Sequence, residues 1–491
     1  MSRSLFARLA ARHGPRIDPV TRRQFLAATL AASAAVLAGC ALPRRDAGAK
    51  PSGKQIVVVG AGFAGLACAH ELLNAGSDVT MFEARRRVGG RVLSFTDFVP
   101  GKVVEGGGEL IGSNHPVWVA YAERFGLEFL DVTEAEDAEF PIVLGGRRLS
   151  AAESESLYEE MDAALQRMNA DAARVDADQP WRTSGAAALD ARTTKQWIES
   201  LDCAPLCRHG LTVQFASDNG QDVARQSYLG NLAQVKGGGL ETYWTESEVY
   251  RCRGGNQQLA DRLADAVGRE RIHMGAPVRS IEDRGERCVV TGADGRVVEC
   301  DTVVLAVPPT VWDRIDIRPA LPAAMRPQMG VNVKHLSYVR SRFWRQAGLA
   351  PDSLTDGDVS MTWEGTDNQP GDEGACLTCF SGGPAAEAVR ARVGDARAAA
   401  YRGAIGSIYA GYADQVRATR FMDWPGDEWT RTGYSFPAPG QVTTVGPLLR
   451  AGVGNIRFAG EHACYAFVGY MEGGLQSGLR AAKSVLASPA H

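Results

Sequence analysis

A glycine-rich turn between an apolar run and a helix constrains the fold of this chain most. Residues 56–65 read IVVVGAGFAG, and a second apolar run, DVTMFE at 78–83, ends in Glu83. The β-branched run predicts a buried parallel strand, and the glycines predict a tight turn into a helix. Such a turn brings backbone N–H groups to a pyrophosphate, and an acid about 20 residues on accepts hydrogen bonds from ribose hydroxyls. The pattern predicts dinucleotide binding by Gly60, Gly62, Ala64, Gly65 and Glu83.

The segment after Glu83 indicates which dinucleotide is bound. Residues 83–91 read EARRRVGGR, which resembles the second glycine motif of the flavin-containing amine oxidase superfamily. In that family the Gly-Gly pair passes close to FAD, and the arginines meet phosphate and ribose oxygens. The resemblance implies that Arg85 and Arg91 contact FAD, whereas Arg86 and Arg87 fit a solvated loop equally well.

Further segments resemble the same family in the same order. They are PVRSI at 277–281, DTVVLAVPP at 301–309, FMDWP at 421–425, RFAGEH at 457–462 and GYMEGG at 469–474. The resemblance implies a valine near the adenine, a strand returning to the FAD domain, and a tryptophan and a C-terminal helix against the flavin. The cofactor-binding residues implied here, with the GGGE run at 106–109, are Gly108, Glu109, Val278, Trp424, Gly460, Glu461 and Met471.

The resemblance implies an α/β fold with a Rossmann-like FAD-binding domain and a discontinuous α+β substrate domain with a helical cover. We assign residues 54–115, 246–309 and 446–491 to the FAD-binding domain, and 116–245 and 310–445 to the substrate domain. Residues near 150–178 and 184–210 have helical composition, and the Asp-Gly turn within 288–300 predicts a hairpin. The alternating run at 333–339 predicts an antiparallel strand, and the flavin ring is expected at the domain junction.

The resemblance also implies the residues that surround the reacting amine. Flavin amine oxidation transfers a hydride equivalent to flavin N5, so the protein orients the amine and keeps the site dry. Lys334 matches a lysine that holds a water against N5, and its charge would favour the reduced flavin. Tyr434 and Tyr470 match two cage aromatics. Gly433 stands where monoamine oxidases carry a flavin-linked cysteine, so FAD is predicted to bind noncovalently.

The predicted function is oxidation of a small-molecule amine to an imine, which hydrolyses to an aldehyde or ketone, with O2 or an electron carrier reoxidising the flavin. An L-amino acid oxidase is the first alternative; it needs a cation for the carboxylate, which Arg431 or an arginine of the helical cover could supply. Glu109 and Glu472 could instead attract a cationic amine or bond backbone groups beside the flavin. A desaturase of the phytoene or protoporphyrinogen type and a non-catalytic flavin-binding protein are further alternatives. Lys334 and the tyrosine pair disfavour the desaturase.

The first 40 residues have the features of a twin-arginine, lipoprotein-type signal peptide. TRRQFL at 21–26 is followed by an apolar run, 25–38, that is too short to span a bilayer, and LAGC at 37–40 resembles a lipoprotein cleavage site. Cys40 would carry the lipid and 41–53 would form a tether; an unmodified periplasmic protein is the alternative. The net charge of −4 gives no reason to expect nucleic acid. We therefore predict export and no membrane contact except through Cys40.

The chain has 10 cysteines, of which two pairs have suggestive spacing. Cys376 and Cys379 form a C-x-x-C pair without a second pair at zinc-ribbon spacing. Cys203 and Cys207 lie one helical turn apart, which favours two packed thiols. No metal is expected.

Overall fold

The computed structural model describes residues 5–14, 52–132, 138–371 and 373–488. The twin-arginine motif, the apolar run 25–38 and Cys40 lie outside the described residues. Within the described part of the chain, none of the helices combines the length and the apolar composition required to cross a bilayer.

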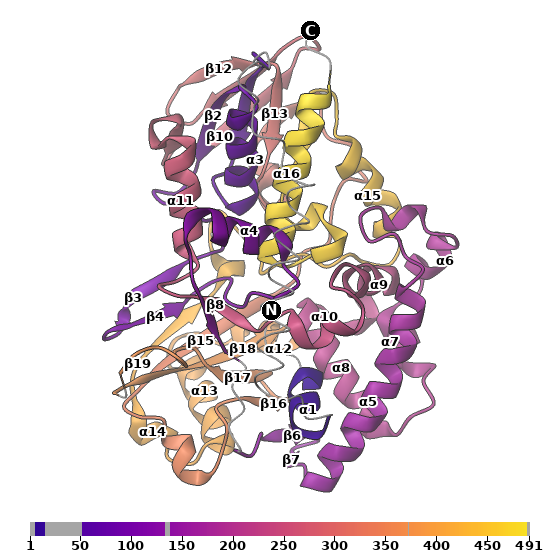
Figure 1. Ribbon diagram of the computed structural model, residues 1–491, viewed down its shortest axis with the longest axis vertical. Helices are drawn as coiled ribbons and strands as arrows, with labels where there is room; N and C mark the ends of the chain where they lie inside the picture. Colours follow the sequence, from indigo (N-terminus) through magenta and orange to yellow (C-terminus); the bar gives the residue numbers. More distant parts are fainter. Residues whose placement is uncertain (1–4, 15–51, 133–137, 372, 489–491) are drawn as a thin grey trace.

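A five-stranded parallel sheet organises the upper half of the molecule in Figure 1. Its strands in order are β20 (Ile456–Phe458), β13 (Thr302–Leu305), β1 (Gln55–Val59), β2 (Asp78–Glu83) and β9 (Ile272–Met274). The pairing of β13 with β1 confirms the predicted returning strand. Ile56 and Val58 pack under the helices on one face, and Val57 and Val59 pack toward a second sheet on the other. Burial on both faces explains why the run is apolar throughout.

Helices cover one face of the parallel sheet. The helices α3 (Phe63–Asn74) and α16 (Met471–Ala487) run side by side there, and α11 (Gln257–Val267) lies beside α3 (Figure 1). The helix α15 (Gln441–Ala451) packs against β20.

A four-stranded sheet packs on the opposite face. Its order is β12 (Val297–Cys300), β11 (Cys288–Gly292), β10 (Val278–Asp283) and β14 (Asp316–Arg318). The antiparallel β11–β12 pair confirms the predicted hairpin, and Gly295 in its turn has φ of 84°. Strand β14 follows residue 309, so the structure extends this lobe past the predicted boundary.

A seven-stranded sheet forms the second lobe. Its order is β19 (Val416–Met422), β15 (Asn332–Val339), β18 (Ala375–Gly382), β17 (Met361–Glu364), β16 (Ser353–Thr355), β6 (Ile142–Leu144) and β7 (Arg147–Arg148). Strand β15 is antiparallel to both of its neighbours, as its alternating sequence predicted. Val333 packs into the core with the helices α12 (Pro384–Ala391), α13 (Gly394–Ile408) and α14 (Tyr412–Gln415), which leaves Lys334 on the other face.

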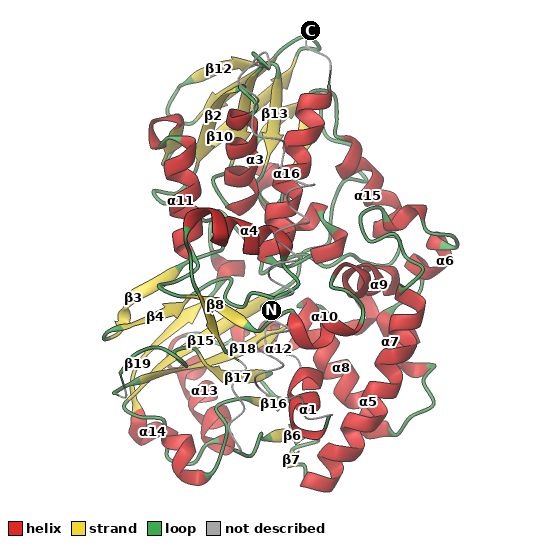
Figure 2. Cartoon of the chain, in the orientation of Figure 1, coloured by secondary structure: helices red, strands yellow, loops and turns green. Residues whose placement is uncertain are grey.

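Helices flank this sheet on one side (Figure 2). They are α5 (Ala151–Ala172), α6 (Ala186–Ala191), α7 (Thr194–Glu199), α8 (Pro205–Asn219), α9 (Tyr228–Gly237) and α10 (Glu241–Glu246). A capping box of Ser150 and Glu153 starts α5. These helices form the predicted cover. A further helix, α1 (Leu5–His13), packs against α5 and α10.

The structure also differs from the predicted boundary at residue 115. The helix α4 (Pro116–Phe125) was assigned to the substrate domain, yet Val117 and Trp118 belong to the core that α3 and α16 build. The next strand, β5 (Phe129–Asp131), pairs with β8 (Tyr250–Cys252). The hairpin of β3 (Ser94–Val99) and β4 (Lys102–Glu105) connects the lobes. Packing of distant segments decides this boundary, and local sequence does not encode it.

Candidate active site

One cavity joins the nucleotide-binding turn to the predicted tyrosine pair. It encloses about 1700 Å³ of space, its open mouth included, and every predicted site residue except Gly65 lines it. Gly65 packs the helix onto the strand: a Cβ there would lie 1.9 Å from the Gly60 carbonyl oxygen. The structure gives Gly65 this packing role, and its contact with the cofactor stays a prediction.

The turn after β1 is shaped for a phosphate group. Gly60 has φ of 103°, and a Cβ there would lie 2.9 Å from the Ala306 carbonyl oxygen. The helix α3 begins after Gly62 with no side-chain cap and no acid in its first turn. Its first N–H groups are therefore available to an anion, which fits the pyrophosphate of a dinucleotide.

Glu83 holds this turn in addition to lining the cavity. Its two carboxylate oxygens accept hydrogen bonds from the backbone N–H groups of Ala61 and Arg85, each at 2.8 Å. Burial raises the pKa of Glu83. Glu83, which was predicted from its spacing to bind ribose, thus also supports the turn. Its spacing in the sequence did not indicate this second role.

The two predicted arginines of the second glycine motif are both engaged by protein groups. Arg85 forms an ion pair with Asp427 and donates to Thr430 Oγ1 at 2.7 Å. Arg91 donates to the Gly433 carbonyl oxygen at 2.8 Å and to Glu461 Oε1 at 2.9 Å. Arg91 therefore connects the motif to the segment that carries the first tyrosine.

Glu461 joins the segments of both tyrosines. Its carboxylate accepts from Ser435 Oγ at 2.6 Å and from the Gly469 N–H at 2.9 Å. Ser435 follows Tyr434, and Gly469 precedes Tyr470. Burial opposes the charge, but Arg91 holds the pKa of Glu461 below its ordinary value. An ionised Glu461 therefore fixes the spacing of the two aromatic residues.

Lys334 lies on β15 with its ammonium buried at the cavity. Its Nζ donates to Glu109 Oε2 at 2.7 Å and to the Gly107 carbonyl oxygen at 2.8 Å, and lies 3.4 Å from the Glu105 carbonyl oxygen. The side chain of Lys334 is 9% exposed. Lys334 is therefore a buried lysine and does not face solvent.

Glu109 is the charged centre of a buried network. Besides Lys334, it accepts from Arg251 Nε and Trp363 Nε1, each at 2.8 Å. Burial favours its neutral form, but Lys334 and Arg251 hold its pKa below the ordinary value. Sequence reasoning missed Arg251 and Trp363, because neither residue stands in a motif. This network engages Glu109 with two protein cations.

Tyr434 is positioned by backbone pairing and by its hydroxyl. The Gly330 N–H donates to the Tyr434 carbonyl oxygen at 2.6 Å. The hydroxyl accepts from Asn332 Nδ2 at 2.8 Å and donates to the Asp218 carbonyl oxygen at 2.7 Å. At Gly433 a Cβ would lie 2.2 Å from Asn332 Oδ1, so no linking cysteine fits there.

Tyr470 lies at the start of α16, next to groups that the motif did not indicate. His115 contacts its ring edge-on with centroids 5.2 Å apart, and burial lowers the pKa of His115 to about 3. The imidazole is therefore neutral. Gly469 lies against the Tyr434 ring, where a Cβ would be 3.1 Å from Cδ2. The two tyrosines thus line the same end of the cavity.

Acidic groups lie near this end. Burial raises the pKa of both Tyr434 and Tyr470, and the carboxyl groups of Asp218 and Glu248 raise it further. Burial also raises the pKa of Glu248 and favours its neutral form, so the negative charge here is that of Asp218. A negative potential of this kind favours a cation and disfavours an anion.

The remaining predicted contacts lie along the cavity wall. Trp424 donates from Nε1 to the Gly106 carbonyl oxygen at 2.9 Å. At Gly108 a Cβ would lie 2.9 Å from Met471 Cγ, so the two residues close one wall together. Val278 and Gly460 also line the cavity.

Two residues proposed for substrate recognition have other roles. Arg431 is 43% exposed in its side chain, bonds Asp313 at 3.1 Å, and does not line the cavity. Arg431 is therefore not placed to bind a substrate carboxylate in the cavity. Glu472 accepts from the N–H groups of Val117 and Trp118, each at 2.9 Å, and so caps α4.

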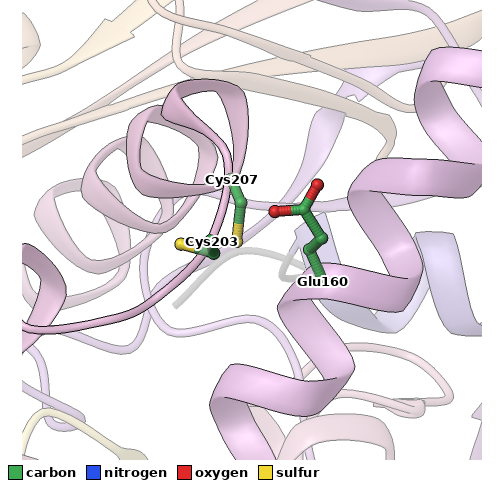
Figure 3. A group of neighbouring side chains, drawn as sticks. All are labelled: Glu160, Cys203 and Cys207. Carbon is green, nitrogen blue, oxygen red and sulfur yellow. The ribbon is translucent and has the colours of Figure 1, made fainter.

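Cys203 and Cys207 do come together, and Glu160 of α5 joins them (Figure 3). Their ligand atoms all lie within 4.8 Å of one another. Burial and a hydrogen bond with Cys203 raise the pKa of Cys207, and Glu160 accepts from the Ala204 N–H at 2.5 Å. These bonds suit packed thiols, and the expected absence of a metal stays a prediction.

Comparison with known proteins gives a consistent result. A family model described as flavin containing amine oxidoreductase matches residues 63–486. The probable flavin-containing monoamine oxidase A of Dictyostelium discoideum is 25% identical over 456 residues, which cover 88% of this chain and 97% of the relative. The solved structure of wild-type putrescine oxidase bound to putrescine is 26% identical, with a TM-score of 0.79, over 89% of this chain and 99% of that one. Cyclohexylamine oxidase from Brevibacterium oxydans IH-35A is 27% identical, with a TM-score of 0.79, over 88% and 98%.

The glycine turn, the long cavity and the buried lysine define a flavoprotein oxidoreductase. The chain belongs to the flavin-containing amine oxidoreductase family, whose model covers most of its length. It is an FAD-dependent enzyme that oxidises amines, and O2 is the acceptor that the family implies. The amino acid oxidase and desaturase alternatives are not favoured.

Proposed function

We propose that the substrate is an amine without a carboxylate, and that a diamine is preferred. The observation that carries this proposal is the charge at the tyrosine end of the cavity. Asp218 and Glu248 both raise the pKa of the tyrosines, and because burial raises the pKa of Glu248 as well, the negative charge on which the proposal rests is that of Asp218. Among the described residues that line the cavity, the arginines are Arg85, Arg91 and Arg314, and none belongs to the segments that hold the tyrosines. A substrate carboxylate would therefore find no arginine from the tyrosine segments, and Asp218 would repel it.

Different residues along the cavity have different roles in the proposed reaction. The first turn of α3 and Glu83 would hold the phosphate and ribose groups of FAD, and Trp424 and Met471 would hold its flavin. FAD, when bound, supplies the hydride acceptor. Tyr434 and Tyr470 orient the amine nitrogen between their faces, and Glu461 maintains their spacing. Lys334 places its ammonium at the reacting edge, where it favours negative charge.

Matched substrates test this proposal directly. Putrescine and ornithine differ only by the carboxylate, as do phenethylamine and phenylalanine. Under anaerobic conditions, loss of flavin absorbance near 450 nm reports transfer of electrons from each compound. We expect putrescine and phenethylamine to bleach the flavin faster than their amino acid counterparts. Faster bleaching by ornithine or phenylalanine would overturn the choice of substrate and leave the amine oxidase assignment intact.

We further propose that the protein is exported by the twin-arginine route and anchored by lipid at Cys40. Support comes from the sequence alone: the arginine pair at 22–23, the apolar run and the LAGC site. A folded flavoprotein suits a route that carries folded proteins. Replacing Arg22 and Arg23 by lysine should retain the protein in the cytoplasm, because recognition uses the guanidinium group. Cys40→Ser should abolish labelling by a radioactive fatty acid, and persistent labelling would refute the anchor.

A further inference from the structure

The helix α1, which precedes the twin-arginine motif, is docked on the substrate domain. Leu5, Phe6 and Leu9 on one face of α1 are buried, with 0%, 5% and 1% exposure, whereas Ala11 and Arg12 on the other face are exposed. The helix lies against α5 and α10 (Figure 1). Its apolar side chains join the core of the helical cover. This segment lies within the predicted signal peptide, where a free leader would have been expected.

Specific contacts fix α1 in this groove. The Phe6 ring stacks on Tyr158 of α5 with centroids 5.8 Å apart and meets Trp244 of α10 edge-on at 6.5 Å. The Phe6 N–H donates to Gln214 Oε1 of α8 at 3.0 Å. Arg8 forms an ion pair with the buried Asp352. The groove thus recognises α1 through apolar packing, a backbone hydrogen bond and a charge pair.

Two of the helices that hold α1, namely α8 and α10, also contact the tyrosines of the active site. Near the end of α8, the Asp218 carbonyl oxygen accepts the hydrogen bond from Tyr434. On α10, Tyr243 packs edge-on against Trp244 at 4.8 Å and packs against the apolar cluster that contains Tyr470. Among the described residues, those lining the cavity include none from α5, α8 or α10. The helices α8 and α10 therefore adjoin the cavity through Tyr434 and Tyr470, which line it.

Docking of α1 depends on its covalent connection to the domain. An isolated helix of nine residues is marginal in water, so α1 is ordered by the groove. The free energy gained by burying its three apolar side chains must offset the conformational entropy lost when the whole segment becomes ordered. A covalent tether raises the effective concentration of a weakly binding helix such as α1 to the millimolar range. When the tether is cut, this high effective concentration is lost.

We propose that the surface of α5, α8 and α10 is a docking site for the leader helix α1, which keeps the amine side of the active site closed until the leader is cut off. This inference rests on the proposed export and removal of the leader. In the uncut chain α1 ties α5, α8 and α10 together around the tyrosines. Removal of the leader releases α10 and opens the way for the amine.

The test uses the full-length, FAD-loaded chain with a specific protease site placed in residues 41–53. Leu9→Asp puts a charge into the groove, and Ala11→Asp puts the same charge on the exposed face of α1 as a matched control. We expect the 1–40 fragment to separate from the cut protein in gel filtration. At subsaturating putrescine, cut wild type and uncut Leu9→Asp should bleach the flavin about threefold or more faster than uncut wild type. Uncut Ala11→Asp should match wild type.

Two results would overturn the proposal. In the first, the cut protein and Leu9→Asp bleach no faster than the uncut wild type, which would make α1 a structural part of the domain. In the second, a protease cleaves residues 5–14 equally fast in the Leu9→Asp and Ala11→Asp chains, which would show that α1 is not docked. The protease and elution measurements need no amine turnover. They therefore separate a failure of docking from a failure of the proposed substrate.

Discussion

Lys334 Nζ lies 2.7 Å from Glu109 Oε2, and both groups are buried at the wall of the flavin cavity. Glu109 is bonded on its other side by Arg251, so two cations share one carboxylate. The lysine charge is therefore held in place by the protein before substrate arrives. A preorganised charge of this kind costs no reorganisation during the reaction.

Lys334→Met tests the role of this charge. The variant keeps the apolar stem and should still bind FAD, because the ammonium lies away from the phosphate-binding turn. Flavin reduction or reoxidation should slow by roughly 10–100-fold, which corresponds to loss of one charge-assisted bond. Anaerobic stopped-flow with amine, then mixing with oxygenated buffer, separates the two steps. Lys195→Met on the surface is the control, and equal rates in all three proteins would assign Lys334 to structure alone.

Glu461→Gln tests the link between the two tyrosines. Glutamine keeps the size but lacks the charge that bonds Arg91, Ser435 and Gly469. We expect the apparent affinity for amine to weaken and unfolding stability to fall by about 1.5–3 kcal/mol. Rates of flavin bleaching over a range of amine concentration, with thermal unfolding, give both quantities. The exposed Glu159→Gln is the control; a Glu461→Gln protein that behaves like this control would contradict the linking role.

Glu83→Gln tests the acid in the nucleotide-binding turn. The amide presents only one acceptor oxygen, so one of the N–H groups of Ala61 and Arg85 loses its partner. The purified variant should contain less FAD than wild type, as measured by the ratio of absorbance at 450 nm to that at 280 nm. Asp78→Asn, at the exposed start of the same strand, should retain full occupancy. Full occupancy in both variants would argue against the ribose contact.

Acid precipitation tests the mode of FAD attachment. Because no side chain fits at Gly433, no covalent bond to the flavin forms there. All yellow colour should pass into the supernatant, and the pellet should be colourless. A yellow pellet would reveal attachment at another residue.

Glu472 makes stability depend on pH in a defined direction. Burial raises its pKa to about 7, above the ordinary value of 4.5. The folded state therefore holds this proton more tightly, and the contribution to stability is complete below about pH 4.5 and lost as pH rises through 7. The shift corresponds to about 3 kcal/mol at most. Melting temperatures should fall less between pH 5 and pH 8 in Glu472→Gln than in wild type or in Glu159→Gln; parallel curves would contradict this.

Local pattern was enough to predict the elements and most of the cavity lining. Gly60 and Gly62 are required where the backbone turns and a phosphate approaches, and the Asp-Gly turn predicts the β11–β12 hairpin. These constraints act between residues close in sequence or within a family motif, so they are visible without coordinates. The same holds for Gly433, whose lack of a side chain excludes a cysteine link.

Only the tertiary structure decided which distant groups meet. Glu461 reaches Ser435 and Gly469, Glu109 reaches Arg251 and Trp363, and Glu472 caps α4, all across segments far apart in the chain. Arg431 stands just before Tyr434 in the sequence, yet its side chain is exposed to solvent. Long-range packing sets these partners because a buried charge requires an ion pair or hydrogen bonds, and the fold decides which groups lie close enough to supply them. The sequence alone therefore determined the family, the cofactor and the turn, whereas the fold determined the charges around the amine.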